Sequence, residues 1–205
     1  MRITPIYTGA EPLYKALAKA TSKAREDSEW SYVRERLDEV TTLYEAILEY
    51  KARAGLTLPK TVVDPIEGLE SLEEPSVIIE KLSEIEARLR GILPYYKATS
   101  MYTTRARLAA SLLLVIIAGY LLYIGGSLEA LMVAVAGVGL GVSGLFTYTS
   151  PASSILVLAG AVLQGLIAGR DPYLVIAWIL AVLASAIASV LPLAFKLPAS
   201  YGEGV

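Results

Sequence analysis

Residues 128–147 read LEALMVAVAGVGLGVSGLFT, a stretch whose only charged side chain, Glu129, lies near its start. A helix needs about 20 mostly apolar residues to cross the hydrocarbon core of a bilayer. The stretch therefore predicts a transmembrane helix. Its small residues recur at spacings of four and three, which places them on one face of that helix. They are Ala130, Ala134, Gly137, Gly141 and Gly144.

Small side chains on one face of a membrane helix let a neighbouring backbone approach closely, and lipid supplies no hydrophobic force that would otherwise pair the helices. A second small-residue face with the same spacing lies near the end of the chain. Its residues are Ala177, Ala181, Ala184 and Ala188. We expect the two helices that carry these faces to pack more closely than any other pair.

Four segments have the length and composition of membrane spans, namely Leu108–Ile124, Leu128–Thr147, Ala152–Ala168 and Tyr173–Phe195. The links between them are short and turn-like, so neighbouring spans run antiparallel. We therefore predict an all-α integral membrane protein with a four-helix transmembrane bundle over residues 108–196. A juxtamembrane helical extension is expected over residues 98–107, and a short cytoplasmic tail over residues 197–205.

The glycine-rich part of the quoted stretch also matches two enzyme signatures. Residues 139–144 fit G-x-G-x-x-G, but a dinucleotide site needs a strand before its glycine turn, and here the glycines lie inside a helix-length apolar segment. Residues 141–144 resemble the setting of the nucleophile in rhomboid-type intramembrane serine proteases, which implies Ser143 with a histidine base. The chain has no His, so Ser143 lacks that activator. We predict a packing face and neither of these sites.

The residue types that are missing restrict the chemistry further. The chain has neither His nor Cys, which removes the usual base near neutral pH, the thiolate nucleophile and the commonest metal ligands. No catalytic, cofactor-binding or metal site is therefore predicted. The single glutamine, Gln164, is predicted to hydrogen-bond to a neighbouring helix or, alternatively, to contact a pore or substrate. The scarcity of thermolabile residues suggests a hyperthermophilic, archaeal source.

Charged residues are concentrated before residue 98, where 14 of the 18 basic and 17 of the 20 acidic residues lie, giving a net charge of −3. Lys97, Arg105 and Arg107 precede the first predicted span, and Lys196 follows the last. Because Lys and Arg near span ends favour the cytoplasmic side, we expect a multi-pass cell-membrane protein with both termini in the cytoplasm. No basic patch is interleaved with aromatics, so nothing favours a nucleic-acid partner.

Residues 1–97 are predicted to form a cytoplasmic α-helical domain built on a hairpin or coiled coil. Two runs of apolar residues in this domain follow the heptad spacing of four and three. The first is Trp30, Val33, Leu37, Val40, Tyr44 and Ile47, and the second is Ile78, Leu82, Ile85, Leu89 and Ile92. These seams predict pairing with each other in an antiparallel hairpin, or with a partner protein or a second copy.

The boundaries of the helices in this domain are less certain from the pattern. Residues 12–54 form either one helix or two, since Asp27 and Ser28 can cap a second one. The link over residues 56–75 holds three prolines and is expected to be extended. Gly91 and Pro94 are expected to loosen the end of the helix that follows.

Two charged segments have two possible interpretations each. Lys15, Lys19 and Lys23 form a stripe at helical spacing that is either a solvated face or a contact for anionic lipid. The acidic residues between 64 and 74 form a solvated loop or attract a basic partner.

The function that fits these patterns is a non-enzymatic membrane scaffold or assembly subunit. Its partners are expected to be the lipid bilayer and a protein, or a second copy, bound by the cytoplasmic helices. The alternative is a homo-oligomeric channel or passive transporter, with Ser143, Gln164, Ser185 and Ser189 as polar lining. An enzyme acting on lipid is disfavoured, because the spans carry neither His nor Cys nor paired carboxylates.

Overall fold

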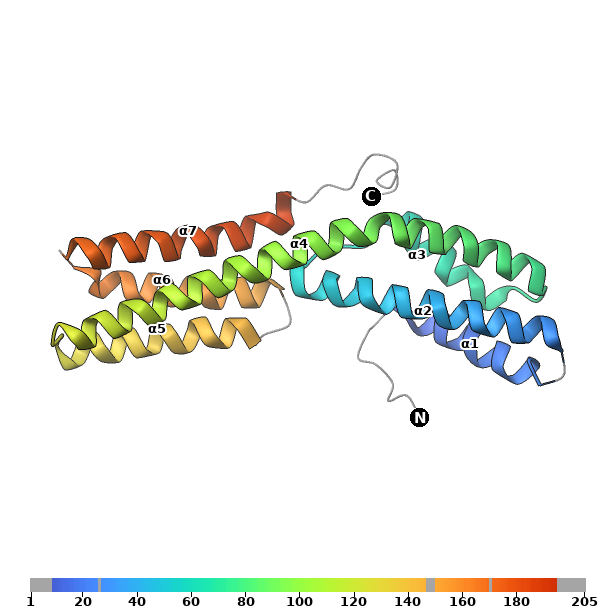
Figure 1. Cartoon of the computed structure of the whole chain (residues 1–205), viewed down its shortest axis with the longest axis horizontal. Coiled ribbons are helices and arrows are strands. Elements are labelled where there is room, and N and C mark those ends of the chain that lie inside the picture. Colours follow the sequence, from blue (N-terminus) through green and yellow to red (C-terminus); the bar gives the residue numbers. More distant parts are fainter. Residues whose placement is uncertain (1–8, 26, 147–149, 170, 195–205) are drawn as a thin grey trace. The chain divides into compact units, whose positions relative to one another are not determined.

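The structure is a computed structural model that describes residues 9–25, 27–146, 150–169 and 171–194. Every regular element in these ranges is helical, and none is a strand, which confirms the all-α class for the described residues (Figure 1). The helices are α1 Glu11–Lys23, α2 Ser28–Ala54, α3 Lys60–Glu67, the 3-10 turn η1 Gly68–Ser71, α4 Pro75–Tyr123, α5 Leu128–Phe146, α6 Ser150–Ala168 and α7 Pro172–Ala194. The predicted span ends Thr147 and Phe195 and the predicted tail 197–205 lie outside the described residues.

The chain divides into two compact units. Of the described residues, the N-terminal unit contains 9–25, 27–51 and 57–97, and the bundle unit contains 52–56, 98–146, 150–169 and 171–194. Helix α4 contributes residues 75–97 to the first unit and 98–123 to the second.

Residues 12–54 form two helices, because α1 ends at Lys23 and α2 begins at Ser28. The Oδ1 atom of Asp27 accepts a hydrogen bond of 2.9 Å from the backbone N–H of Glu29. This bond satisfies one of the donors that the first turn of α2 leaves unpaired. The shorter helix α1 lies along α2 in Figure 1.

The two heptad seams form the core of the N-terminal unit. Every residue of both runs, from Trp30 to Ile47 on α2 and from Ile78 to Ile92 on α4, is buried. Arg36 of α2 forms an ion pair with Glu86 of α4 beside this core. The residues considered for partner binding are therefore covered by the chain itself.

The middle of the link between α2 and α4, residues 60–71, is helical, so the expectation of an extended link is wrong there, although residues 56–59 and 72–74 lie outside the helices. Pro59 takes an extended conformation just before α3, where its missing N–H costs nothing. Val62, Ile66 and Leu69 are buried at spacings of four and three. Burial of this apolar face favours a helix where the prolines alone predicted none.

Helix α4 continues past Gly91 and Pro94, and the expected end of the helix at these residues is wrong. Proline removes the hydrogen bond to the carbonyl four residues earlier, here that of Arg90. Pro94 is exposed, so water can hydrate that carbonyl, and the long run of residues on either side keeps its helical hydrogen bonds. A proline on a solvated face interrupts one bond of the helix without ending it.

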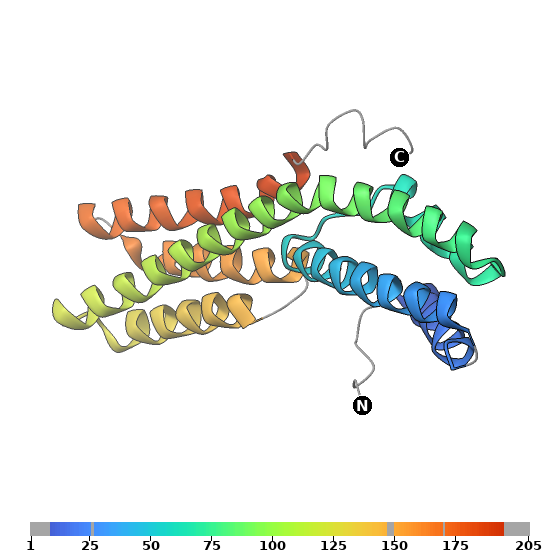
Figure 2. The ribbon, with the colours of Figure 1, turned by 45° about the vertical axis from the view of Figure 1, so that its right-hand side comes forward.

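Three helices are long and apolar enough to cross a membrane, namely α4, α5 and α7. Helix α6 contains a shorter apolar stretch over Ile155–Ile167. In Figures 1 and 2, α5 and α7 lie on opposite sides of the bundle, with α4 and α6 between them. The outer surfaces carry large exposed side chains such as Leu112, Leu166 and Leu183. Such a surface suits contact with lipid tails.

Candidate functional site

The small-residue face of α5 packs directly on α6. A Cβ atom added to Gly144 would lie 2.8 Å from the carbonyl oxygen of Ser153 and 2.6 Å from a methyl carbon of Val157. One added to Gly137 would lie 3.0 Å from the carbonyl oxygen of Gly160. The two backbones therefore approach so closely that any side chain larger than hydrogen must push them apart.

The partner of this face differs from the expected one. Gly141 faces Leu114 of α4, whose methyl carbon would lie 2.8 Å from an added Cβ. The remaining close approaches of the face, at Gly137 and Gly144, are to α6. The expectation that the second and fourth predicted spans pack most closely is wrong, because α6 carries its own glycine, Gly160, opposite the glycines of α5. Of the other residues in this face, Ala134 is buried and Ala130 is half-buried.

Three polar side chains from neighbouring helices bind backbone carbonyls of α5. Ser111 Oγ of α4 donates to the Gly141 carbonyl at 3.1 Å, and Ser153 Oγ of α6 donates to the Gly144 carbonyl. Gln164 Nε2 of α6 donates to the Ala134 carbonyl at 2.9 Å. Residues without bulky side chains leave their carbonyls open to such donors. The packing face of α5 is thus also a row of hydrogen-bond acceptors.

Gln164 connects three helices at the centre of the bundle. Its side chain is fully buried, and Nε2 also donates to the Leu114 carbonyl of α4 at 3.1 Å. A flip of the amide would place Oε1 against both carbonyls, so these two acceptors fix its orientation. The structure thus places Gln164 in interhelical hydrogen bonds, the first of its two predicted roles.

Trp178 anchors α7 to α6, and the sequence interpretation missed it. Its indole Nε1 donates to the Ala161 carbonyl at 2.8 Å. The ring lies over Gly165, where an added Cβ would be 2.6 Å from Nε1. The one available signal was its position, because membrane tryptophans favour the interface with water and this one lies inside a predicted span.

The small-residue face of α7 is only partly buried. Ala181 and Ala188 are buried, whereas Ala177 and Ala184 are half-buried. Ala181 packs with Leu114 of α4 and Ala161 of α6 in one apolar cluster. The face therefore meets α4 and α6.

The serines considered as pore lining have different environments. Ser185 Oγ donates to the Ala181 carbonyl at 2.8 Å, and Ser189 Oγ donates to the Ser185 carbonyl at 2.9 Å, both within α7. Ser143 is exposed on the outer side of α5. The structure does not bring Ser143, Gln164 and Ser185 together around one path within the described bundle.

Charged side chains of the bundle unit stabilise helix ends. Asp171 Oδ1 accepts hydrogen bonds from the backbone N–H groups of Tyr173 and Leu174, at 2.9 and 3.2 Å, and so caps α7. Arg107, only 5% exposed, donates to the Arg53 carbonyl at 3.0 Å at the end of α2. A cation at a helix C-terminus satisfies open carbonyls and opposes the helix dipole.

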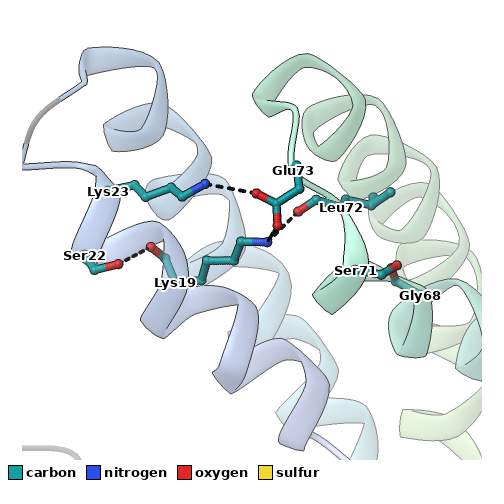
Figure 3. A network of polar contacts seen from close by, with 7 residues as sticks. All are labelled: Lys19, Ser22, Lys23, Gly68, Ser71, Leu72 and Glu73. Atoms are coloured by element: carbon teal, nitrogen blue, oxygen red, sulfur yellow. Dashed lines mark hydrogen bonds and ion pairs between the residues drawn. The ribbon is translucent and has the colours of Figure 1, made fainter.

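In the N-terminal unit, the lysine stripe binds the link between α2 and α4. Lys19 and Lys23 of α1 both reach the carboxylate of Glu73, at 2.8 and 3.2 Å (Figure 3). These contacts, with that of Lys19 first, lower the pKa of Glu73. Lys23 also lies 4.4 Å from the centre of the Trp30 ring. Lys19 and Lys23 thus bind other residues of the unit.

Among the described residues, no group of three or more acidic side chains is arranged to hold a metal ion. The candidate site is the α5 face, where close glycine contacts and three side-chain donors from α4 and α6 meet. Comparison of the chain with protein-family models, curated proteins and solved structures found no match.

Proposed function

We propose that this protein is a non-enzymatic, polytopic membrane scaffold or assembly subunit. A helical bundle anchors it in the bilayer, and the N-terminal helices bind a partner protein or a second copy. Two features support this function. Polar side chains in the bundle form hydrogen bonds between its helices, and a large part of the chain forms the charged N-terminal unit.

We infer that α6 is a fourth membrane span. Its 19 residues give a helix about 28 Å long at about 1.5 Å per residue, close to the roughly 30 Å hydrocarbon core. Its one deep polar side chain, Gln164, is fully buried against α4 and α5. A polar residue facing the bundle interior is compatible with a span.

Four spans put both ends of the bundle on one side of the membrane. Lys97, Arg105, Arg107 and Lys196 then lie on that side, and the positive-inside rule makes it the cytoplasm. The described acidic residues of the bundle unit, Glu129 and Asp171, belong to the opposite end. This orientation keeps the charged N-terminal unit in the cytoplasm.

The observation that carries the proposal is the use of polar side chains in the bundle. Ser111, Ser153, Gln164 and Trp178 each donate to a backbone carbonyl of a neighbouring helix. Catalysis and transport need polar groups that face a substrate or a path. Polar groups that bind helices together suit a protein whose task is to hold a fixed assembly.

The test is to isolate the full chain from native membranes with a mild detergent, identify what copurifies and measure the mass of the complex. We expect a specific partner or a defined homo-oligomer. A matched variant, Trp178→Phe, tests the role of the bundle, because it removes the indole donor while keeping an aromatic ring. A monomer that copurifies with no protein would contradict the proposal.

One observation favours the alternative function of an oligomeric channel. The outer side of α5 exposes Ala136, Gly139 and Ser143, and an added Cβ at Gly139 would contact nothing within 4 Å. Several copies could arrange these small residues around a shared path. Planar-bilayer recording of the purified oligomer would decide, since a scaffold gives no conductance under voltage or tension.

A further inference from the structure

Residues 57–74 of the link, called the strap below, contain a helix with little intrinsic stability. Helix α3 has eight residues, contains Pro65, and has no side-chain cap at its N-terminus. It starts at Lys60 and has Asp64 and Glu67 in its last turn, so each charge lies beside the end of the helix dipole that has the same sign, which destabilises the helix. A helix this short is marginal in water even with favourable residues. Contacts with the rest of the unit must hold the strap in place.

Helix α4 holds the first half of the strap by its backbone. Pro65 has no N–H, so the Thr61 carbonyl loses its usual helical donor. Arg88 of α4 supplies one at 2.6 Å. The hydroxyl of Tyr96, also on α4, donates to the Thr57 carbonyl. Both anchors bind main-chain atoms.

Helix α1 holds the second half through lysines. Lys19 Nζ donates to the Leu72 carbonyl at 2.9 Å and to Glu73 at 2.8 Å, and Lys23 binds the other oxygen of Glu73 (Figure 3). The Glu73 side chain is 75% exposed, so water and salt screen these pairs. This end of the strap depends on contacts that weaken readily.

Beneath the strap is apolar surface of the core. Val62, Ile66 and Leu69 are almost completely buried, although they belong to a segment of low helical stability. If the strap leaves, its seat exposes an apolar surface bordered by Lys19 and Lys23 of α1 and by Arg88 of α4, which is paired with Glu84. That seat is basic at its edges and apolar along its floor.

We propose that the strap is a displaceable cover, and that its seat on α1 and α4 is the docking site for an acidic amphipathic helix of a partner protein. This inference rests on the proposed scaffold function and names where its cytoplasmic partner binds. The heptad seams are buried within the chain, so a partner gains apolar contact only where a segment can move away. The strap is the segment whose own sequence contributes least to its helix.

The strap itself defines the chemistry of the partner. Val62, Ile66 and Leu69 follow one another at spacings of four and three, and Glu73 comes four residues later. A competing helix needs aliphatic side chains at the same spacing and a carboxylate after them for Lys19 and Lys23. Charge complementarity favours an acidic partner over a basic one, because the seat presents cations.

The first test uses the full chain in detergent, with Lys19→Cys and Glu73→Cys introduced together. The chain has no other Cys, so a short bis-maleimide joins these positions alone. Without the linker, the contacts of residue 19 on α1 with Leu72 and residue 73 are lost. With the linker, the strap stays attached to α1. We expect amide exchange over residues 60–71 to be at least tenfold faster without the linker, while residues 30–47 are unchanged. The control pair, Ser83→Cys with Ala87→Cys, occupies two exposed positions one turn apart on α4 and should alter neither region.

The second test adds a labelled peptide of residues 57–75 in trans to the same protein. We expect it to bind the open protein at least tenfold more tightly than the linked one. The difference in peptide affinity between the natural chain and the Lys19→Cys variant should be smaller for a peptide carrying Glu73→Gln than for the natural peptide. The carboxylate of residue 73 no longer contributes to binding in that peptide.

Two results would overturn the inference. Exchange over residues 60–71 that matches the core with and without the linker would mean that the strap does not open. Peptide binding that is equal for the open and linked proteins would mean that the seat is not the docking site. Either result leaves the scaffold function standing if a partner still copurifies with the linked protein, so the two failures are distinguishable.

Discussion

A Cβ atom on Gly160 of α6 would lie 2.5 Å from the carbonyl oxygen of Gly137 on α5. The obstacle is main chain, which cannot rotate away as a side-chain tip can. The nearest atoms after it are a methyl carbon of Leu114 at 3.1 Å and the backbone nitrogen of Gly141 at 3.3 Å. Helices α5 and α6 can therefore keep their separation only while residue 160 has no side chain.

Gly160→Ala should force α5 and α6 apart. Overpacking of this kind costs about 1–3 kcal/mol of unfolding free energy. Gly139→Ala is the matched control, because it lies on the same bundle with nothing within 4 Å of an added Cβ. Alanine there should be neutral or stabilise the helix by up to about 1 kcal/mol. Unfolding in mixed micelles measures the unfolding free energy of both variants. Equal destabilisation by Gly160→Ala and Gly139→Ala would contradict the close approach of α5 and α6.

Two substitutions of Gln164 are predicted to destabilise the bundle by different amounts. Gln164→Leu removes the donors to Ala134 and Leu114 but fills the same space, and hydrogen bonds between membrane helices are worth about 0.6 kcal/mol on average. Gln164→Asn keeps an amide too short to reach both carbonyls, and a buried unsatisfied amide costs about 1–3 kcal/mol. We expect Asn to destabilise the bundle more than Leu in the same unfolding assay. The reverse order would show that volume, and not hydrogen bonding, determines the contribution of Gln164.

Periodicity located the faces of the helices but could not assign their partners. The spacing of Ala134, Gly137 and Gly141 requires only that some backbone lies near, and that requirement is equally met by α4, α6 or α7. The choice of α6 depends on Gly160, which belongs to neither of the two small-residue faces predicted from the sequence. A single sequence carries no information on which two small faces meet.

The structure of the N-terminal unit was also only partly predictable from the sequence, for a different reason. Its heptad seams marked the buried positions of α2 and α4, because burial follows the spacing of four and three. The strap was misread because three prolines indicate an extended chain, whereas burial of Val62, Ile66 and Leu69 overrides that local preference. The anchors Arg88 and Tyr96 bind main-chain carbonyls, and such bonds have no sequence pattern.

Two serines in the bundle distinguish a packing role from a catalytic one. Ser153 is fully buried and donates to the Gly144 carbonyl, whereas Ser143 is exposed on the outer side of α5. Ser153→Ala should lower the unfolding free energy by about 1 kcal/mol, and Ser143→Ala should change it little. Partner recovery from membranes should survive Ser143→Ala. If that substitution abolished function while the bundle stayed folded, Ser143 would have a chemical role and the scaffold proposal would be wrong.

Burial raises the pKa of Tyr44 and of Tyr96 to about 12, and the carboxylates of Glu67 and Glu11 add to the effect at Tyr44. An unfolded tyrosine titrates near pH 10, so the unfolded state loses its protons first as the pH rises. The stabilisation is therefore complete below pH 10 and is lost as the pH approaches 12. We expect the unfolding free energy of the N-terminal unit to fall across that window. Tyr44→Phe should make the fall shallower, whereas Tyr32→Phe, at a residue that is 52% exposed, should leave it unchanged. Equal slopes in all three proteins would mean that burial of the phenol does not control this pH dependence.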